Sequence, residues 1–451
     1  MKNIHFILLA FVGLSLTIAC ANTSMKQESS IQEEKKLTAD IKPLLDREGD
    51  IANLPEWEGI KEKATELFSN ISQGTENKYD YLYLAAIYMQ EARITGEHPY
   101  YYPAAMQLVD EVINSDAKES LVFQALVMKG SVLLSQHNFE EAMEVGKMAL
   151  KIESFDAKVY GILCDAHVEM GNYEEAVKMA DKMVKIRPDL RSYSRISYLR
   201  EIYGDYEGAI KAMKMAINAG VPGHENTSWC QYTLGTIYED RGDLVNAKKY
   251  YQQSFQQRPN YAFGLAGLGN IELKNKNYDK ALDLTQKAIK VIPEFSFYQQ
   301  LASIYDKIDK KEEFQNIVKE LGQMLTEDQE SGHNMNLEIA NIALELENNP
   351  QRALKFAEKE YQIRPNNRQV CESMAIIQAT IGNHNLALNL IEKSAVAEKI
   401  STNLTGWKGW ILYQEGKKSQ GKKLMQQSIK LNPFSEEKWV HNAKDLGIID
   451  V

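Results

Sequence analysis

The segment 277–293, NYDKALDLTQKAIKVIP, repeats the pattern of the segment 172–188, NYEEAVKMADKMVKIRP. Both begin with Asn-Tyr, two charged residues and an alanine (Ala281 and Ala176), continue with apolar residues at helical spacing, and close on a proline. Apolar residues that recur every three or four positions predict an amphipathic helix, and a proline cannot continue it. The two segments therefore predict that one helical unit occurs more than once in the chain.

The same pattern continues in both directions from these two segments. Its anchor positions are Ala142, Ala176, Ala209, Ala247, Ala281, Phe314, Ala353, Ala387 and Gly421. Consecutive anchors lie about 34 residues apart, with somewhat longer gaps before Ala247 and Ala353. At one fixed distance before each anchor stands a residue that is usually small, namely Gly130, Cys164, Ser197, Gly235, Gly269, Ala302, Asn341, Ala375 and Gly409. Small residues at a fixed interval predict two helices that cross closely in every unit.

Turn and stop signals recur with the same period. An Asn or Asp before an aromatic or apolar residue marks the turn between the two helices, at Asn138, Asn172, Asp205, Asp243 and Asn277. A proline at a constant position after the anchor closes five of the units, at Pro188, Pro259, Pro293, Pro365 and Pro433. Five of the nine units therefore carry this turn signal, and five carry the stop signal.

These residues resemble the tetratricopeptide repeat, a helix-turn-helix unit of about 34 residues. The resemblance covers about Leu121 to Pro433 in nine units, and a degenerate tenth unit precedes them. The sixth of the nine departs from the pattern, because it carries Phe314 in place of alanine and lacks the closing proline. The resemblance implies an all-α, right-handed superhelical solenoid of about ten helical hairpins, whose first helices line a concave surface that binds an extended peptide or a helix of a partner.

The chain accordingly divides into six predicted segments. They are a lipoprotein signal peptide (1–19), a flexible tether (20–37), an N-terminal helical cap (38–79), a degenerate repeat-like unit (80–118), nine repeat units (119–434) and a C-terminal capping helix (435–451). A single short hairpin cannot bury enough apolar surface to fold alone, so each unit depends on its neighbours.

The stretch FGLAGLGNIE, residues 263–272, carries three glycines but does not predict a phosphate-binding loop. Its spacing is G-x-x-G-x-G, and no β-branched strand precedes it. Gly269 is expected to be the crossing-point residue of a first helix. Gly264 and Gly267 are then only tolerated in that helix, and each costs up to about 1 kcal/mol relative to alanine.

The first twenty residues, MKNIHFILLAFVGLSLTIAC, predict an export signal, since a lysine precedes an apolar run too short to span a bilayer. The end of this stretch resembles a bacterial lipobox, which implies lipidation of Cys20, although Thr17 stands where that family prefers leucine. The alternative is ordinary secretory cleavage at Ala19-Cys20-Ala21. The favoured location is the bacterial cell envelope, with a lipid anchor in the outer membrane and the folded body facing the periplasm.

Charge and composition exclude several classes of function. The net charge of −10 and the pI near 5.5 argue against nucleic-acid binding, which needs a basic surface. The histidines never pair at helical i, i+4 spacing, and no nucleophile elbow or kinase motif occurs. We therefore expect no catalytic residues, no metal site and no cofactor. The scattered Cys164, Cys230 and Cys371 are expected to be buried apolar side chains.

The outward positions of the central first helices predict a partner-binding groove. Its residues are Tyr198, Trp229, Tyr232, Phe263, Asn270 and Lys274. Aromatic residues beside polar groups are typical of interface hot spots. The alternative is that the aromatic rings pack between neighbouring repeats.

These features favour a membrane-anchored, non-enzymatic scaffold or adaptor that binds a protein or peptide partner, in the assembly or maintenance of an envelope complex. The alternative is an envelope lipoprotein that captures a carbohydrate or another small molecule. Such lipoproteins insert long segments between their repeats, and this chain has almost none.

Overall fold

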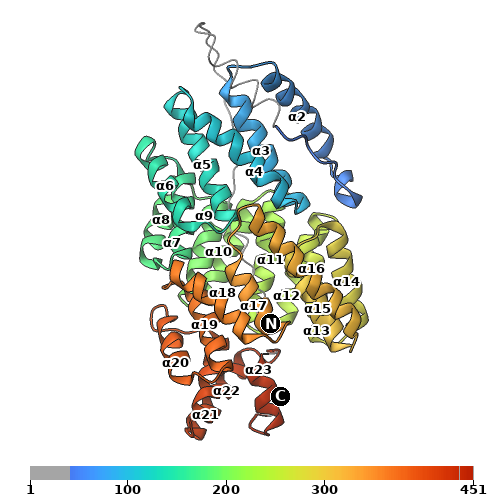
Figure 1. Ribbon diagram of the computed structural model, residues 1–451, viewed down its shortest axis with the longest axis vertical. Helices are drawn as coiled ribbons and strands as arrows, with labels where there is room; N and C mark the ends of the chain where they lie inside the picture. The colour runs from blue at the N-terminus through green and yellow to red at the C-terminus, as the bar shows by residue number, and fades with distance from the viewer. Residues whose placement is uncertain (1–40, 436, 450–451) are drawn as a thin grey trace. The chain divides into compact units, whose positions relative to one another are not determined.

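The computed structural model describes residues 41–435 and 437–449 (Figure 1). The predicted signal peptide, the tether and Cys20 lie outside these residues. In the described chain, α-helices are joined by short turns, and the extended pairing found there is a single isolated bridge between Val396 and Lys399. The elements are η1 (Gly49–Asn53), α2 (Trp57–Ser72), α3 (Lys78–Thr95), α4 (His98–Asn114), α5 (Glu119–Ser135), α6 (Phe139–Ile152), α7 (Ala157–Glu169), α8 (Tyr173–Ile186), α9 (Leu190–Ile202), α10 (Tyr206–Ala219), α11 (Glu225–Asp240), α12 (Leu244–Gln257), α13 (Ala262–Lys274), α14 (Tyr278–Val291), α15 (Phe295–Lys307), α16 (Lys311–Glu330), α17 (Asn336–Glu345), α18 (Pro350–Ile363), α19 (Arg368–Thr380), α20 (His384–Lys393), α21 (Thr402–Gln414), α22 (Lys418–Leu431) and α23 (Lys438–Asp445).

The helices from α3 to α22 follow one another as ten hairpins, and α2 and α23 flank them in the described part of the sequence. The prediction of an all-α fold of about ten helical hairpins is therefore confirmed. Within a hairpin the two helices contact each other along their length, as α9 and α10 or α21 and α22 do.

The described residues form two compact units. The smaller unit comprises 41–163 with 327–334, and the larger unit comprises 164–326 with 335–449 apart from residue 436. The core of the smaller unit is made by α2 to α5 and includes the buried aromatic residues Tyr81, Tyr88 and Tyr101. The larger unit contains the hairpins from α9/α10 to α21/α22.

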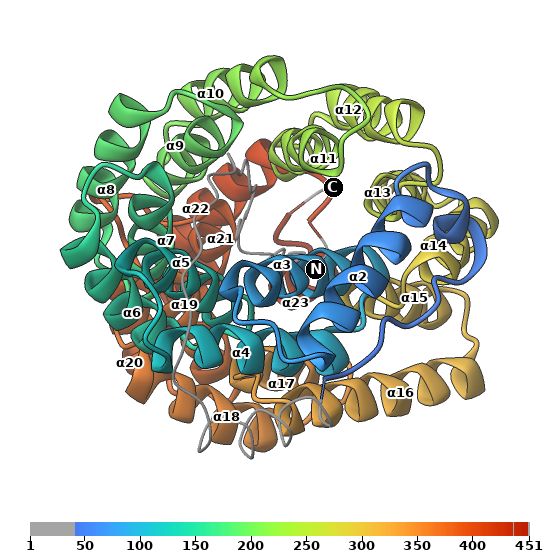
Figure 2. The same cartoon turned by 90° about the horizontal axis from the view of Figure 1, so that it is seen from above.

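First and second helices of a hairpin differ in how they are buried. In α13 every residue except Leu268 and Lys274 is buried, whereas α14 buries only Ala281, Thr285 and Ala288. The spacing of those three residues places them on one face of α14, the pattern of an amphipathic surface helix. In the larger unit, α9, α11 and α13 lie on the concave side and α10, α12 and α14 cover them from outside (Figure 2). The first helices are therefore enclosed by their neighbours.

The predicted turn and stop signals have the expected structural roles. Asn138, Asn172, Asp205, Asp243 and Asn277 are the N-cap residues of five second helices. The Asp205 carboxylate accepts a hydrogen bond from the backbone N–H of Gly208 at 3.0 Å, which satisfies one of the helix's unpaired donors. The helices α8, α12, α14, α18 and α22 each end two residues before their closing proline.

The anchor alanines lie at the helix crossings. Ala142, Ala176, Ala209, Ala247, Ala281, Ala353 and Ala387 are all 0% exposed. Gly269 also lies at a close crossing, because a Cβ there would stand 2.7 Å from Nε2 of Gln300 and 2.9 Å from Oγ1 of Thr285. The predicted role of Gly269 is confirmed.

Gly264 and Gly267 have a larger role than the sequence indicated. A Cβ on Gly264 would lie 2.5 Å from Oγ of Ser254, and a Cβ on Gly267 would lie 2.7 Å from Cδ1 of Tyr251. The expectation that both glycines are merely tolerated in α13 is wrong. They leave space for α12, and Gly267 in particular leaves the space that the ring of Tyr251 occupies.

Segments about 195 residues apart in the sequence contact each other inside the larger unit. Nη1 of Arg364 lies 2.8 Å from Oε2 of Glu169, and the backbone N–H of Arg368 donates to the hydroxyl of Tyr173 at 2.7 Å. Gly171, with φ +76°, approaches the backbone of Asn366 so closely that a Cβ would lie 2.3 Å from its carbonyl oxygen. The turn after α7 therefore packs directly on the turn after α18.

The smaller unit contains a contact of similar separation. The segment 327–334 lies against the turn between α5 and α6, where Asn334 donates its N–H to the carbonyl of Gln136 at 2.9 Å. Asn138 donates to the carbonyl of Gly332 at 3.0 Å. The ring of His333 stacks with that of His98, and burial lowers the pKa of His333 to about 4 and that of His98 to about 3. Both rings are thus neutral near neutral pH.

Candidate functional site

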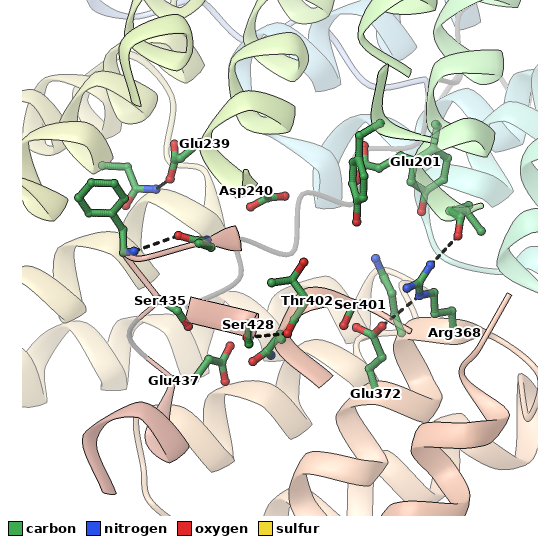
Figure 3. A pocket seen from close by; sticks show the side chains of 18 of the residues that line it. Glu201, Glu239, Asp240, Arg368, Glu372, Ser401, Thr402, Ser428, Ser435 and Glu437 are labelled. Carbon is green, nitrogen blue, oxygen red and sulfur yellow. Dashed lines mark hydrogen bonds and ion pairs between the residues drawn. The ribbon is translucent and has the colours of Figure 1, made fainter. Parts of the chain in front are cut away.

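A cavity of about 170 Å³, lined by both polar and apolar groups, lies inside the larger unit (Figure 3). One wall comes from α9, α11 and α13, and the facing wall comes from α19, α21 and the segment that leads from α22 to α23. The walls are distant in sequence, since Tyr198 and Gln369 both line the cavity. Repeats that are not neighbours in the chain therefore build one site.

Charged side chains of the lining are mostly acidic. Its carboxylates are Glu201, Glu239, Asp240, Glu372 and Glu437, and its cations are Lys274 and Arg368. In Figure 3, Glu239 and Asp240 lie on one side of the space, across from Thr402, Ser428 and Ser435. The lining therefore carries more negative than positive charge.

Uncharged polar groups, tyrosine rings and the apolar side chains of Val168, Ile202, Leu273 and Phe434 complete the lining. Tyr173, Tyr198 and Tyr206 contribute three rings from α8, α9 and α10. Hydroxyl and amide groups come from Asn270, Asn367, Gln369, Ser401, Thr402, Asn403, Ser428, Asn432 and Ser435. This combination suits a ligand that hydrogen-bonds and stacks rather than a purely apolar one.

Two residues at the start of α19 join the walls of the cavity. Asn367 caps this helix with its side-chain oxygen and donates its Nδ2 to the carbonyl of Glu169 at 2.9 Å. Arg368 donates from Nη1 to the carbonyl of Ile202, and its Nε lies 3.1 Å from Oε1 of Glu372. The start of α19 is thus fixed against the ends of α7 and α9.

Glu239 is held at the edge of the cavity by three partners. The hydroxyl of Tyr251 donates to its Oε2 at 2.7 Å, Nδ2 of Asn270 donates to Oε1, and Nζ of Lys274 lies 3.3 Å from Oε1. Because the ring of Tyr251 fits against Gly235 and Gly267, the glycines of α11 and α13 indirectly position this carboxylate.

The structure brings together only half of the predicted groove residues at the cavity. Tyr198, Asn270 and Lys274 line it. Asn270 lines the cavity while its Nδ2 also donates a hydrogen bond to Oε1 of Glu239.

Trp229, Tyr232 and Phe263 do not form an exposed aromatic strip, and this expectation is corrected. They are 6%, 2% and 6% exposed. The ring of Trp229 lies 5.4 Å from that of Tyr232 and 5.3 Å from that of Phe263, measured between centroids. Phe263 also contacts Phe297 of the next hairpin. The rings fill the space between neighbouring first helices, where edge-to-face packing stabilises the stack.

Sequence reasoning missed the facing wall of the cavity. Arg368, Glu372 and Thr402 belong to repeats that follow the central ones much later in the chain, and Glu437 caps α23 after the last repeat. The outward positions of a single helix do not show which helix far along the sequence faces them.

Other sequence predictions concern single residues. Cys164, Cys230 and Cys371 are free and buried, as predicted.

In the described ranges, no three His, Cys, Asp or Glu side chains are grouped so that they could hold a metal ion. Within the same ranges, none of the helices combines the length and the apolar character needed to cross a membrane.

Comparison with known proteins agrees with the hairpin pattern. A family model described as tetratricopeptide repeat matches residues 232–295, and a second with the same description matches residues 157–190. These matches fall on α11 to α14 and on α7 and α8. The matched hairpins, α7/α8, α11/α12 and α13/α14, are tetratricopeptide repeats.

Similar proteins share only part of their length with this chain. The TPR repeat-containing protein MJ1428 of Methanocaldococcus jannaschii is 24% identical over 54% of this chain and 42% of its own length. Hsp70-Hsp90 organizing protein 2 of Arabidopsis thaliana is 26% identical over 40% of this chain and 32% of its own. The chain thus matches less than half the length of either relative.

Among solved structures, a tetratricopeptide repeat protein from Parabacteroides merdae is 16% identical and aligns with a TM-score of 0.37. That alignment covers 59% of this chain and 99% of the other. Proteins with these repeats generally act as scaffolds for protein interactions.

Proposed function

We propose that the protein is a non-enzymatic scaffold of the bacterial cell envelope that binds a protein or peptide partner in the cavity between α9–α13 and α19–α23. The observation that carries this proposal is the cavity itself, whose polar and aromatic groups come from separate repeats. The central first helices supply one of its walls, which is the surface where repeats of this kind receive a partner.

Photocrosslinking in cells that naturally make the protein tests the site. A photoreactive p-benzoylphenylalanine replaces Gln369 or Ser435, which line the cavity, or Glu358, which lies on the exposed face of α18. We expect one protein to be captured from both cavity positions and not from position 358. Capture from position 358 alone, or from all three positions equally, would contradict the assignment of the cavity as the binding site.

The proposed attachment to the membrane is through a lipid on Cys20. It is supported by the apolar segment before this cysteine and the polar, charged segment after it. Growth with labelled palmitate is expected to label the wild type and to leave Cys20→Ala unlabelled. Cys230→Ala is the control, because Cys230 is buried in α11 and should not affect labelling. Equal labelling of the wild type and Cys20→Ala would exclude the anchor.

A second candidate function is capture of a small polar molecule, such as a carbohydrate. The observation that favours it is the density of hydroxyl, amide and tyrosine groups around a cavity of only about 170 Å³. If the crosslinking positions in the cavity capture no protein, this function replaces the scaffold.

A further inference from the structure

The segment 327–334 is fixed to the turn between α5 and α6 by hydrogen bonds from both sides. Asn334 donates its backbone N–H to the carbonyl of Gln136 at 2.9 Å, and Nε2 of Gln136 donates to the carbonyl of Ser331 at 3.3 Å. Nδ1 of His137 lies 3.2 Å from the carbonyl oxygen of Asn334. Packing between successive repeats does not account for this docking, because the two segments are about 195 residues apart.

His333 is buried in this contact with one ring nitrogen unpaired. It is 7% exposed, and its Nδ1 lies 3.2 Å from the carbonyl oxygen of Asp328. A carbonyl oxygen can only accept, so Nδ1 carries the hydrogen of the neutral ring. Nε2 is then the acceptor nitrogen, and it is buried with no hydrogen-bond partner among the described residues. The docked segment therefore holds His333 as a neutral imidazole.

Aromatic rings of α4 surround this imidazole. The ring centroid of His333 lies 6.2 Å from that of His98 and 5.8 Å from that of Tyr102. The rings of His98 and Tyr102 also stack on each other, with 5.2 Å between centroids. A proton on Nε2 of His333 would place a positive charge and an unpaired N–H donor in this buried space, and both cost free energy.

The charged groups around these rings come from α3, α4, the α5–α6 turn and α16. Arg93 and His137 add to the effect of burial, because like charges oppose protonation of His98. Glu97 has its pKa raised from 4.5, first by burial and then by Glu327 of α16. A carboxyl whose pKa is raised in the docked state favours docking in acid. Glu97 therefore cannot be the cause of a release at low pH.

The lowered pKa values of the two histidines set the direction in which pH acts on docking. Burial is the main cause that lowers the pKa of His333 from 6.5 to about 4 and that of His98 from 6.5 to about 3. The docked rings thus bind a proton less tightly than released rings would. Docking is accordingly at full strength above the ordinary histidine pKa of 6.5 and weakens as the pH falls from there toward about 4.

We propose that the segment 327–334 is a pH-sensitive latch, which stays docked on α4 and the α5–α6 turn while the rings of His98 and His333 are neutral and is released when they take up protons. Release breaks the hydrogen bonds to the turn and uncovers the rings on α4. This regulation goes beyond the proposed scaffold function and does not depend on it.

Hydrogen exchange of the full chain, followed by mass spectrometry, tests this proposal. The amide of Asn334 reports docking, because its acceptor is the carbonyl of Gln136 on the other side of the contact. Dividing the intrinsic exchange rate at each pH by the observed rate gives a protection factor, which measures how seldom the contact opens. We expect this factor to fall at least about twenty-fold between pH 7 and pH 5, the effect of one histidine with a pKa of about 4 when docked and 6.5 when released.

A double variant locates the protons that cause this fall. His98→Phe with His333→Phe keeps two aromatic rings in place but removes both titrating groups, so its protection factor at Asn334 should hardly differ between pH 7 and pH 5. The matched control is His224→Phe with His441→Phe, which replaces two exposed histidines and should behave as the wild type does. A fall of wild-type size in the first double variant would overturn the proposal.

The pH at which the wild type loses protection is a second measurement, which decides the matter even where the phenylalanine variant does not dock at pH 7. Protection at Asn334 should begin to fall near pH 6.5. A fall that begins only below pH 4.5, the ordinary pKa of a glutamate, would assign the release to carboxyl groups and refute the latch.

An amide in a turn far from these histidines serves as the internal reference. Asn277 donates its backbone N–H to the carbonyl of Glu272 at 2.9 Å. A hydrogen bond from the Asn277 side chain lowers the pKa of Glu272, so this carboxylate stays ionised at pH 5. Protection at Asn277 should therefore be the same at pH 7 and pH 5. An equal loss at Asn277 and Asn334 would show general unfolding in acid and would also refute the latch.

Discussion

At about pH 9, the variant Arg364→Met is expected to lose about 3–5 kcal/mol of apparent unfolding free energy, the usual cost of removing one partner from a buried ion pair. Arg364 is 5% exposed and lies between two buried carboxylates. Its Nη1 is 2.8 Å from Oε2 of Glu169, and its Nε donates to Oε1 of Glu360. Methionine fills a similar volume but leaves the carboxyl groups without their cation.

The loss of unfolding free energy in Arg364→Met should depend on pH, and the raised pKa of Glu169 sets the direction of that dependence. Burial is the main cause that raises the pKa of Glu169 to about 8, and Arg364 opposes that rise. The folded chain therefore binds this proton more tightly than the unfolded chain, whose carboxyl has a pKa near 4.5. The contribution of Glu169 to stability is accordingly complete at low pH and declines as the pH rises from about 4.5 to about 8.

Arg364 matters most where Glu169 is ionised. The loss in Arg364→Met should be larger at about pH 9 than at about pH 6, where Glu169 is protonated in both proteins. Urea unfolding followed by far-ultraviolet circular dichroism at the two pH values measures the difference.

The control for this substitution is Arg187→Met. Arg187 is exposed and lies 2.9 Å from Asp189, so its loss should cost less than about 1 kcal/mol. An effect of Arg364→Met no larger than that of Arg187→Met would show that the contact between α7 and the end of α18 adds little to stability.

The repeat pattern was predictable because each of its signals is local. The anchor alanines, the Asn and Asp N-caps and the closing prolines act within one hairpin or on the next, so the spacing alone places them. The all-α fold and the crossing-point role of Gly269 followed from these signals, whereas the burial of the three cysteines followed from the usual role of free cysteine.

The candidate site was only partly predictable, for two physical reasons. The first is that α11 and α13 are covered on several sides, so an outward position such as Trp229 or Phe263 still meets a neighbouring ring. The second is that Arg368 and Glu372 reach the cavity through contacts about 195 residues apart in sequence, which depend on how the hairpins curve. The sequence pattern of a single repeat does not predict how the stacked hairpins curve.

Gly267 shows where local propensity and tertiary packing give opposite predictions. Helix propensity alone predicts that Gly267→Ala adds up to about 1 kcal/mol of stability. In the structure the new Cβ would lie 2.7 Å from the ring of Tyr251, which is 1% exposed and bonded through its hydroxyl to Glu239. Because the ring of Tyr251 is buried and its hydroxyl is hydrogen-bonded, it cannot move aside easily. The cost of overpacking is therefore expected to exceed the gain in helix propensity.

Gly267→Ala should therefore destabilise the protein by about 1–3 kcal/mol, the usual range for overpacking a core. Gly322→Ala is the matched control, because Gly322 also lies inside a helix, α16, and a Cβ there would meet no atom within 4 Å. That variant should melt at the same temperature as the wild type or higher. Thermal unfolding of the two variants decides the matter: a rise in melting temperature for both would mean that Tyr251 adjusts freely and that the glycines of α13 are not needed to position Glu239.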